Sequence, residues 1–171
     1  MKNVILIGFM GVGKGSVARE VVKHSEYIAI DTDDIIESME NRKIKKIFQE
    51  DGEEYFRSIE NKIAHWLKNS IQNTLISTGG GFYKQKGLKD IGLVVLLDSP
   101  FDDIIKRIKK HPNAVRKLKK RPLLNDLKLA NKLYDERRPE YLEVADIVID
   151  VTNKSAYDCA KELLKKVKKH V

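Results

Sequence analysis

The segment 8-GFMGVGKGS-16 carries the residue types and spacing best suited to chemistry in this chain. Gly8, Gly13 and Lys14 match the pattern G-x-x-x-x-G-K-[ST], and Gly15 stands where the pattern has a hydroxyl residue. Glycines let such a loop curl so that backbone N–H groups point at phosphate oxygens, and the helix that follows adds the positive end of its dipole. Lys14 supplies a mobile cation for the β- and γ-phosphates. We therefore expect a nucleotide to bind at Gly11, Val12, Gly13, Lys14, Gly15 and Ser16.

Gly15 alters the part of the loop that usually holds Mg²⁺. A Ser or Thr hydroxyl at this position ligates the cation directly, and glycine offers no oxygen. Because Mg²⁺ keeps several waters in most phosphate sites, one more water can take that position. Ser16 is not a substitute, since one step along a helix rotates the side chain by about 100°, and we expect it to face the α-phosphate. The sequence predicts that nucleotide binding persists while metal affinity is weakened.

Two carboxylates follow the second predicted strand, in 31-DTD-33. Asp33 suits a base that orients or deprotonates a substrate hydroxyl, and Asp31 suits the outer shell of the metal, through water. The competing interpretation makes Asp33 the N-cap of the next helix. Asp98 is another strand-end acid and a rival for the metal, but 98-DSPFDD-103 favours a helix start there.

Arg57 and a run of glycines indicate a site for an anionic substrate. On a helix, Glu53 and Glu60 lie on the face of Arg57 and would hold its guanidinium for a bidentate grip on a carboxylate. A surface ladder of ion pairs is the alternative. The run Gly79–Gly81 favours a close approach of backbone to ligand, because glycines weaken a strand interior. The basic, poorly patterned segment around 120-KRPLL-124 suits a mobile lid that closes an arginine over phosphates.

Short apolar runs alternate with helical patterns along the chain. The strand candidates are 4–7, 27–31, 74–78, 93–98 and 147–151. Helical spacing occurs from about Asp51 to Asn69, where Trp66 is expected in the core, and near 128–141. Near-continuous apolar strands alternating with helices predict a five-stranded parallel sheet covered on both faces. Ligands of such sheets bind beyond the C-terminal strand ends, where the glycines and acids lie.

The composition is that of one globular domain over residues 1–171. The net charge is +8, with basic residues concentrated in 106–121 and 161–170. An RNA-binding module is one interpretation of this charge, but no aromatic residues alternate with the basic ones, and we expect no nucleic-acid partner. No run approaches the roughly 20 apolar residues of a membrane span. The single cysteine, Cys159, rules out an internal disulfide and is expected to be buried, in a cytoplasmic protein.

Together these motifs resemble the shikimate kinase family. The matching pieces are GFMGVGK at 8–14, DTD at 31–33, DGEEYFR at 51–57, STGGG at 77–81, RPLL at 121–124 and ERRPEY at 136–141. They follow the order of the family at similar separations and cover almost the whole chain. The resemblance implies a three-layer α/β/α P-loop kinase, like the nucleoside monophosphate kinases. Its parts would be a five-stranded parallel sheet, a lid at about 109–126 and a substrate-binding helical region.

The resemblance also implies an activity and a set of site residues. The activity is transfer of the γ-phosphate of ATP, with Mg²⁺, to the 3-hydroxyl of shikimate, in chorismate and aromatic amino acid biosynthesis, by a monomeric enzyme. The residues implied to bind shikimate are Asp33, Arg57, Gly79, Gly80, Gly81 and Arg137, and those implied to be catalytic are Asp33, Lys14 and Arg121. Arg107, Arg121 and Lys154 would join the loop in holding ATP, with Arg107 and the region around Lys154 beside adenine.

Two departures from the family pattern leave alternatives open. Position 15 normally carries Ser or Thr, and the lid between Arg107 and Arg121 is long and rich in lysine. One alternative is another small-molecule kinase of the same fold, acting on gluconate or a nucleotide. Another is a catalytically impaired nucleotide-binding protein, suggested by Gly15. Arg57 and Arg137 favour a carboxylate substrate.

Overall fold

The computed structural model describes residues 2–119 and 121–170. Its strands are β1 (Val4–Ile7), β2 (Ile28–Asp31), β3 (Thr74–Ser77), β4 (Leu93–Asp98) and β5 (Ile147–Asp150). They form one sheet in the order β2-β3-β1-β4-β5, and every neighbouring pair is parallel. The expected five-stranded parallel sheet is confirmed.

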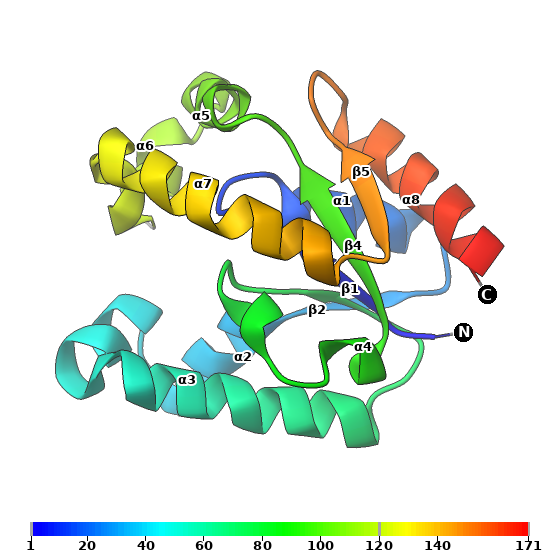
Figure 1. The fold of residues 1–171 in the computed structure, drawn as a ribbon, viewed down its shortest axis with the longest axis horizontal. Helices are drawn as coiled ribbons and strands as arrows, with labels where there is room; N and C mark the ends of the chain where they lie inside the picture. Colours follow the sequence, from blue (N-terminus) through cyan, green and yellow to red (C-terminus); the bar gives the residue numbers. More distant parts are fainter. Residues whose placement is uncertain (1, 120, 171) are drawn as a thin grey trace.

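Helices connect the strands and cover the sheet (Figure 1). They are α1 (Lys14–Lys23), α2 (Thr32–Glu40), α3 (Ile44–Ser70), α4 (Leu88–Ile91), α5 (Phe101–Lys110), α6 (Ala114–Lys119), α7 (Leu127–Val144) and α8 (Ala156–His170), with short 3-10 turns η1 (Phe82–Lys84) and η2 (Pro122–Asn125). Helices α1 and α8 pack together on one side of the sheet, and α7 lies on the other side with α3 and α4 beside it (Figure 1). This confirms the α/β/α layers. Every helix within residues 2–119 and 121–170 is too short or too polar to pass through a bilayer.

Helices bury both faces of the central strands, and the middle strand β1 is apolar along its whole length for this reason. Every residue of β1 and β3 is buried, whereas Ile28 on the edge strand β2 is 71% exposed. Cys159 is buried as expected. The core placement of Trp66 is wrong, since its side chain is 41% exposed. The buried stripe of α3 runs through Ile63 and Leu67, and Trp66 falls beside that stripe.

The register of the strands brings three loops to one level. Leu6 of β1 lies opposite Ser77 of β3, and Ser77 lies opposite Asp31 of β2. The central strand β1 has β3 on one side and β4 on the other, so the chain order reverses there and a crevice opens at the C-terminal strand ends. The loop after β1, the start of α2 and the residues after β3 therefore begin side by side.

Two helical segments differ from the sequence-based expectation. Helix α3 begins at Ile44 instead of near Asp51, and Gly52, with a φ of +81°, divides it at a kink. Glycine adopts this conformation without the steric cost that a Cβ would bring. The basic, poorly patterned segment contains the end of α5 and all of α6. Helix α5 is stable in this lysine-rich sequence because Ile104 and Ile108 bury its inner face.

Candidate active site

The loop between β1 and α1 has the backbone of a phosphate cradle. Gly11 and Gly13 have φ angles of +84° and +109°, which favour glycine. Gly13 precedes the first residue of α1, and no side chain caps this end of the helix. The first N–H groups of α1 therefore point toward the crevice as donors for an anion, with the helix dipole behind them.

Lys14 lies against the inner side of this loop. Its Nζ donates to the carbonyl oxygens of Gly8 at 2.5 Å and Phe9 at 3.2 Å. Burial lowers the pKa of Lys14 to about 8, although the carboxylates of Asp33 and Asp31 act in the opposite direction. An approaching phosphate would raise this pKa again, because a nearby anion stabilises the ammonium ion.

Gly15 is not demanded by the geometry of the chain. Its φ is not positive, and a Cβ built there would meet only Nη1 of Arg19, at the ordinary contact distance of 3.5 Å. The hydroxyl of Ser16 accepts a hydrogen bond from Nη2 of Arg19 at 3.4 Å. A serine at position 15 would therefore fit, so sterics do not explain the loss of the hydroxyl.

Asp31, and not Asp33, is the N-cap of α2. One carboxylate oxygen of Asp31 accepts from the backbone N–H groups of Asp33 at 2.9 Å and Asp34 at 3.4 Å. The other oxygen accepts from the hydroxyl of Ser77 at 2.7 Å. The capping interpretation of Asp33 is wrong because α2 begins at Thr32, directly after Asp31.

The carboxylate of Asp33 is left available for a ligand. It lies against Gly79, where an added Cβ would come within 2.6 Å of Oδ1. This Oδ1 atom is buried and has no hydrogen-bond partner among the described residues. Burial, helped by the negative charges of Asp31 and Glu60, raises the pKa of Asp33 to about 7.

Arg57 is held by both acids that flank it on α3. Its Nη1 donates to Glu60 at 2.6 Å and its Nη2 donates to Glu53 at 3.0 Å, which confirms the predicted arrangement. The interpretation as a surface ladder is wrong for Glu60, whose side chain is only 1% exposed. Burial raises the pKa of Glu60. The second oxygen of Glu60, Oε1, is buried without a partner in the described chain.

Each glycine of the run after β3 faces one charged side chain. An added Cβ would lie 2.6 Å from Oδ1 of Asp33 at Gly79, 3.0 Å from Nη1 of Arg137 at Gly80, and 2.6 Å from Nη1 of Arg57 at Gly81. None of the three has a positive φ, so these positions need glycine for space and not for conformation. The structure thus brings together the three charged residues and the three glycines expected at one site.

Three buried side-chain atoms in the described part of the chain have no hydrogen-bond partner: Oδ1 of Asp33, Oε1 of Glu60 and Nε of Arg137. Asp33 and Arg137 lie against the run Gly79–Gly81, which we call the glycine floor. Glu60 is the acid that holds Arg57. Buried polar groups are paired in the great majority of cases. Their grouping marks a place that is complementary to a small polar ligand.

Tyr141 belongs to the same floor, although sequence reasoning gave it no role. Its hydroxyl donates to the carbonyl oxygen of Gly80 at 2.6 Å, and burial raises its pKa to about 12. The available signal was its spacing, since Tyr141 follows Arg137 by four residues and therefore lies on the same face of α7.

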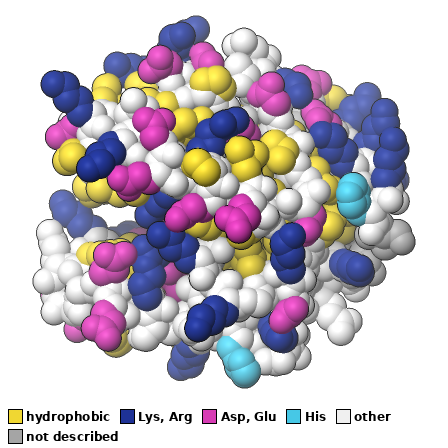
Figure 2. Space-filling model, in the orientation of Figure 1, with side chains coloured by type: hydrophobic (Ala, Val, Ile, Leu, Met, Phe, Trp, Pro, Cys, Tyr) yellow, Lys and Arg dark blue, Asp and Glu magenta, His cyan; other side chains and the backbone are white. Residues whose placement is uncertain are grey.

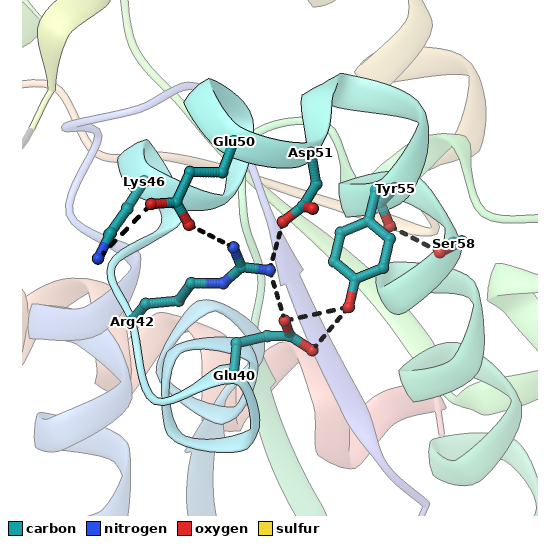
Figure 3. Close-up of polar contacts among 7 residues, drawn as sticks. All are labelled: Glu40, Arg42, Lys46, Glu50, Asp51, Tyr55 and Ser58. Carbon is teal, nitrogen blue, oxygen red and sulfur yellow. Dashed lines mark hydrogen bonds and ion pairs between the residues drawn. The ribbon is translucent and has the colours of Figure 1, made fainter.

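A cluster of ion pairs anchors the segment that carries Arg57 (Figure 3). Arg42, in the turn between α2 and α3, donates to Glu40 at 2.9 Å and Glu50 at 2.7 Å, and it also contacts Asp51. The hydroxyl of Tyr55, beyond the kink at Gly52, donates to Glu40 at 3.1 Å. Arg42 therefore joins the end of α2 to the first part of α3, and Glu40 joins it to the part beyond the kink.

Arg107, Arg121 and Lys154 are the cations predicted to join the loop in holding ATP. The structure brings two of them, Arg107 and Arg121, to the phosphate loop. Nη1 of Arg107 donates to the carbonyl oxygen of Val12 at 2.8 Å, and its guanidinium lies over Gly13. Arg121 is half-buried, and its charge acts on Lys14 of the loop, whose pKa it lowers. Lys154 instead binds Glu162 at 2.8 Å. In the view of Figure 2, a hollow separates α6 and α7 from α2 and α3, and Lys and Arg side chains gather beside it.

Asp98 is paired with an arginine of α7. Its carboxylate accepts a hydrogen bond from Nη2 of Arg138 at 2.8 Å. The expected helix start within residues 98–103 is confirmed, since α5 begins at Phe101, but its N-cap is Pro100 and not Asp98, which is still part of β4. The ion pair with Arg138 also occupies the carboxylate that a metal would need.

The fit to Mg²⁺ depends on very few protein groups. Within residues 2–119 and 121–170, no cluster of three or more His, Cys, Asp or Glu could hold a metal ion. Near the phosphate loop, Asp31 is the candidate acid, and both of its oxygens already accept protein hydrogen bonds. These residues fit a cation held mainly by phosphate oxygens and water.

Comparisons with known proteins agree with this geometry. The family model described as shikimate kinase matches residues 10–168. A shikimate kinase of Helicobacter hepaticus is 35% identical over 171 residues, which is 100% of this chain and 99% of the relative. One of Clostridium botulinum is 42% identical over 157 residues, 90% of this chain and 89% of the relative. The solved structure of shikimate kinase from Acinetobacter baumannii in complex with shikimate superposes with a TM-score of 0.86 at 29% identity, over 99% of this chain and 94% of the other. The chain belongs to the shikimate kinase family.

Proposed function

We propose that this chain transfers the γ-phosphate of ATP to the 3-hydroxyl of shikimate and so produces shikimate 3-phosphate. The observation that carries the proposal is the group of buried, unpartnered atoms on Asp33, Glu60 and Arg137. This group lies at the same end of the sheet as a loop built to hold phosphates. A small acid with hydroxyl groups complements its charges, and shikimate has this chemistry.

The two guanidinium groups bind the carboxylate of the substrate. Arg57 comes from α3 and Arg137 from α7, and both approach neighbouring glycines of one floor. Paired guanidinium groups can each form charge-assisted hydrogen bonds to a carboxylate, which fixes the orientation of the ring. Glu60 holds Arg57 in place for this contact at 2.6 Å.

Asp33 binds the hydroxyl groups and acts as the base. Its pKa of about 7 lies near the pH of the cytoplasm, where a general base combines availability with driving force. A hydroxyl that donates to Oδ1 would satisfy the unpaired oxygen and point toward the phosphate loop. Asp33 would then orient the 3-hydroxyl and accept its proton as the oxygen bonds to the γ-phosphorus. The bond from that phosphorus to the β–γ bridging oxygen breaks in the same transfer, and ADP leaves.

The phosphoryl group is stabilised from the side of the loop. Lys14 and the N–H groups of Gly11 to Ser16 bind the β- and γ-phosphates, and Arg121 adds charge from the lid. Arg107 and the region of Lys154 flank adenine. Mg²⁺ supplies charge neutralisation on the phosphates when bound, with Asp31 in contact through water. Closure of the lid at 109–126 excludes water from the transfer.

The proposed enzyme is a cytoplasmic monomer that acts on small molecules and has no nucleic-acid or membrane partner. One chain supplies every residue of the proposed site, and this supports a monomer. The basic charge has a local use in this proposal, since Lys14, Arg107 and Arg121 face a triphosphate. Nucleic acid is therefore not needed to account for these cations.

A coupled assay of ADP release tests the proposed function. We expect turnover with shikimate to exceed that with gluconate, other hydroxy acids and nucleoside monophosphates by about 100-fold or more in kcat/KM. A magnesium series with shikimate separates the remaining alternative. If ATP and shikimate both bind but no ADP is released at saturating Mg²⁺, the chain is a catalytically impaired binding protein. Equal turnover with gluconate would identify another kinase of this fold.

The variant Arg57→Ala tests the carboxylate contact. We expect the KM for shikimate to rise about 30- to 100-fold, because removing one partner of a buried charge pair costs about 2–3 kcal/mol. The KM for ATP should change less than about threefold, since Arg57 does not face the phosphate loop. Lys62→Ala, exposed on the same helix, is the control. Equal losses for both substrates would contradict the assignment.

The variant Asp33→Asn tests the electrostatic environment of the proposed base in the unliganded protein. The pKa of Asp33 is about 7 when folded and about 4 when unfolded, so its contribution to stability is present at about pH 4 and lost as the pH rises to about 7. We expect urea denaturation to show Asp33→Asn more stable than the parent by up to about 4 kcal/mol at pH 8, with the gain shrinking toward pH 4. Asp34→Asn, exposed in the same turn, is the control. A gain that does not vary with pH would contradict this prediction.

A further inference from the structure

Four cations converge over the start of α1 without an acidic partner. They are Arg19 of α1, Arg107 of α5, Lys117 of α6 and Arg121 beside η2. Within the described residues, none of the four has an Asp or Glu oxygen within ion-pair distance, although Lys23, one turn beyond Arg19 on α1, pairs with Glu20 at 2.6 Å. Their hydrogen bonds go instead to neutral oxygens, such as the carbonyl of Val12.

These cations lie close enough to repel one another. Burial lowers the pKa of Lys117, and the charges of Arg121, Arg107 and Arg19 lower it further. A group of like charges that no acid neutralises is complementary to a polyanion. Arg107 and Arg121 already have places in the proposed nucleotide site, whereas Arg19 and Lys117 have none.

The position of Arg19 is tied to the missing hydroxyl. Arg19 follows Gly15 by four residues, so both lie on one face of α1. Side chains of a helix lean toward its N-terminus, which directs a long arginine back toward the first turn. Its Nη1 lies 3.5 Å from the point where a Cβ of residue 15 would be, and its Nη2 donates to Ser16 at 3.4 Å. The guanidinium is thus beside the position from which a Ser or Thr hydroxyl would reach Mg²⁺.

We propose that Arg19 binds the β- and γ-phosphates of ATP from the space beside Gly15, joined by Lys117 from the lid, and that this chain therefore holds the nucleotide with little dependence on Mg²⁺. A guanidinium has several donors in a planar fork that matches phosphate oxygens, and its charge is permanent. It would replace part of the neutralisation that a protein-held metal gives. The inference rests on the nucleotide site of the proposed function.

Binding of a non-hydrolysable ATP analogue, followed by calorimetry, tests the inference. In excess EDTA, Arg19→Gln should weaken the affinity of the analogue about tenfold, and Lys117→Gln should weaken it by a smaller factor, while Lys23→Gln on the same helix changes it less than about twofold. The parent chain should bind the analogue with less than about a threefold difference between EDTA and saturating Mg²⁺. Shikimate affinity should be unchanged in all variants, which shows that they are folded.

The pair of residues is tested by the double variant Gly15→Ser with Arg19→Gln. It restores the hydroxyl and removes the competing cation, so Mg²⁺ should improve its affinity for the analogue about tenfold or more. Parent-like affinity of Arg19→Gln in EDTA would overturn the inference, as would a tenfold dependence of the parent chain on Mg²⁺. If the parent chain binds shikimate and the analogue in those cases, the proposed function survives. If it binds neither, the proposed function and the inference both fail.

Discussion

The site depends on buried polar atoms that the described part of the fold leaves without hydrogen-bond partners. Asp33, Glu60 and Arg137 each keep a buried atom without a partner in residues 2–119 and 121–170, and such atoms are costly for the unliganded protein. They persist because the surrounding structure holds them: α3 is anchored through Arg42, and Tyr141 binds the glycine floor. A ligand that satisfies these atoms would stabilise the protein and be selected by them. The same few atoms therefore set both the stability of the unliganded protein and its specificity for the ligand.

The sheet supplies the geometry for this arrangement. Because parallel strands β1, β2 and β3 end at one level, the phosphate loop, the start of α2 and the glycine run leave the sheet together. Acids then come from α2 and α3, and arginines from α3 and α7, over a floor with no side chains of its own. The glycine run keeps that floor low enough for three charged groups to meet above it. Phosphate donor and acceptor can thus share one crevice.

Much of this could be predicted from the sequence, and the failures have physical causes. The β1 run is apolar throughout and the β4 run is apolar up to Asp98, because helices bury both faces, so their bounds were predictable. The i−4 and i+3 acids around Arg57 follow from helix geometry. The choice between Asp31 and Asp33 as helix cap depends on the residue at which β2 gives way to α2. Trp66 and Arg19 could not be placed because exposure and convergence on other helices are tertiary properties. Glycine at position 15 signalled a change in the metal site, but only the structure places Arg19 beside it.

The most direct measurement is a crystal structure of the chain with shikimate and ADP bound together. The account predicts the shikimate carboxylate between Arg57 and Arg137, its 3-hydroxyl on Asp33, and the phosphates of ADP on the N–H groups of the loop that contains Lys14. A crevice that stays empty when both compounds are present at saturating concentration would contradict the account. So would a shikimate molecule bound away from the glycine run Gly79–Gly81.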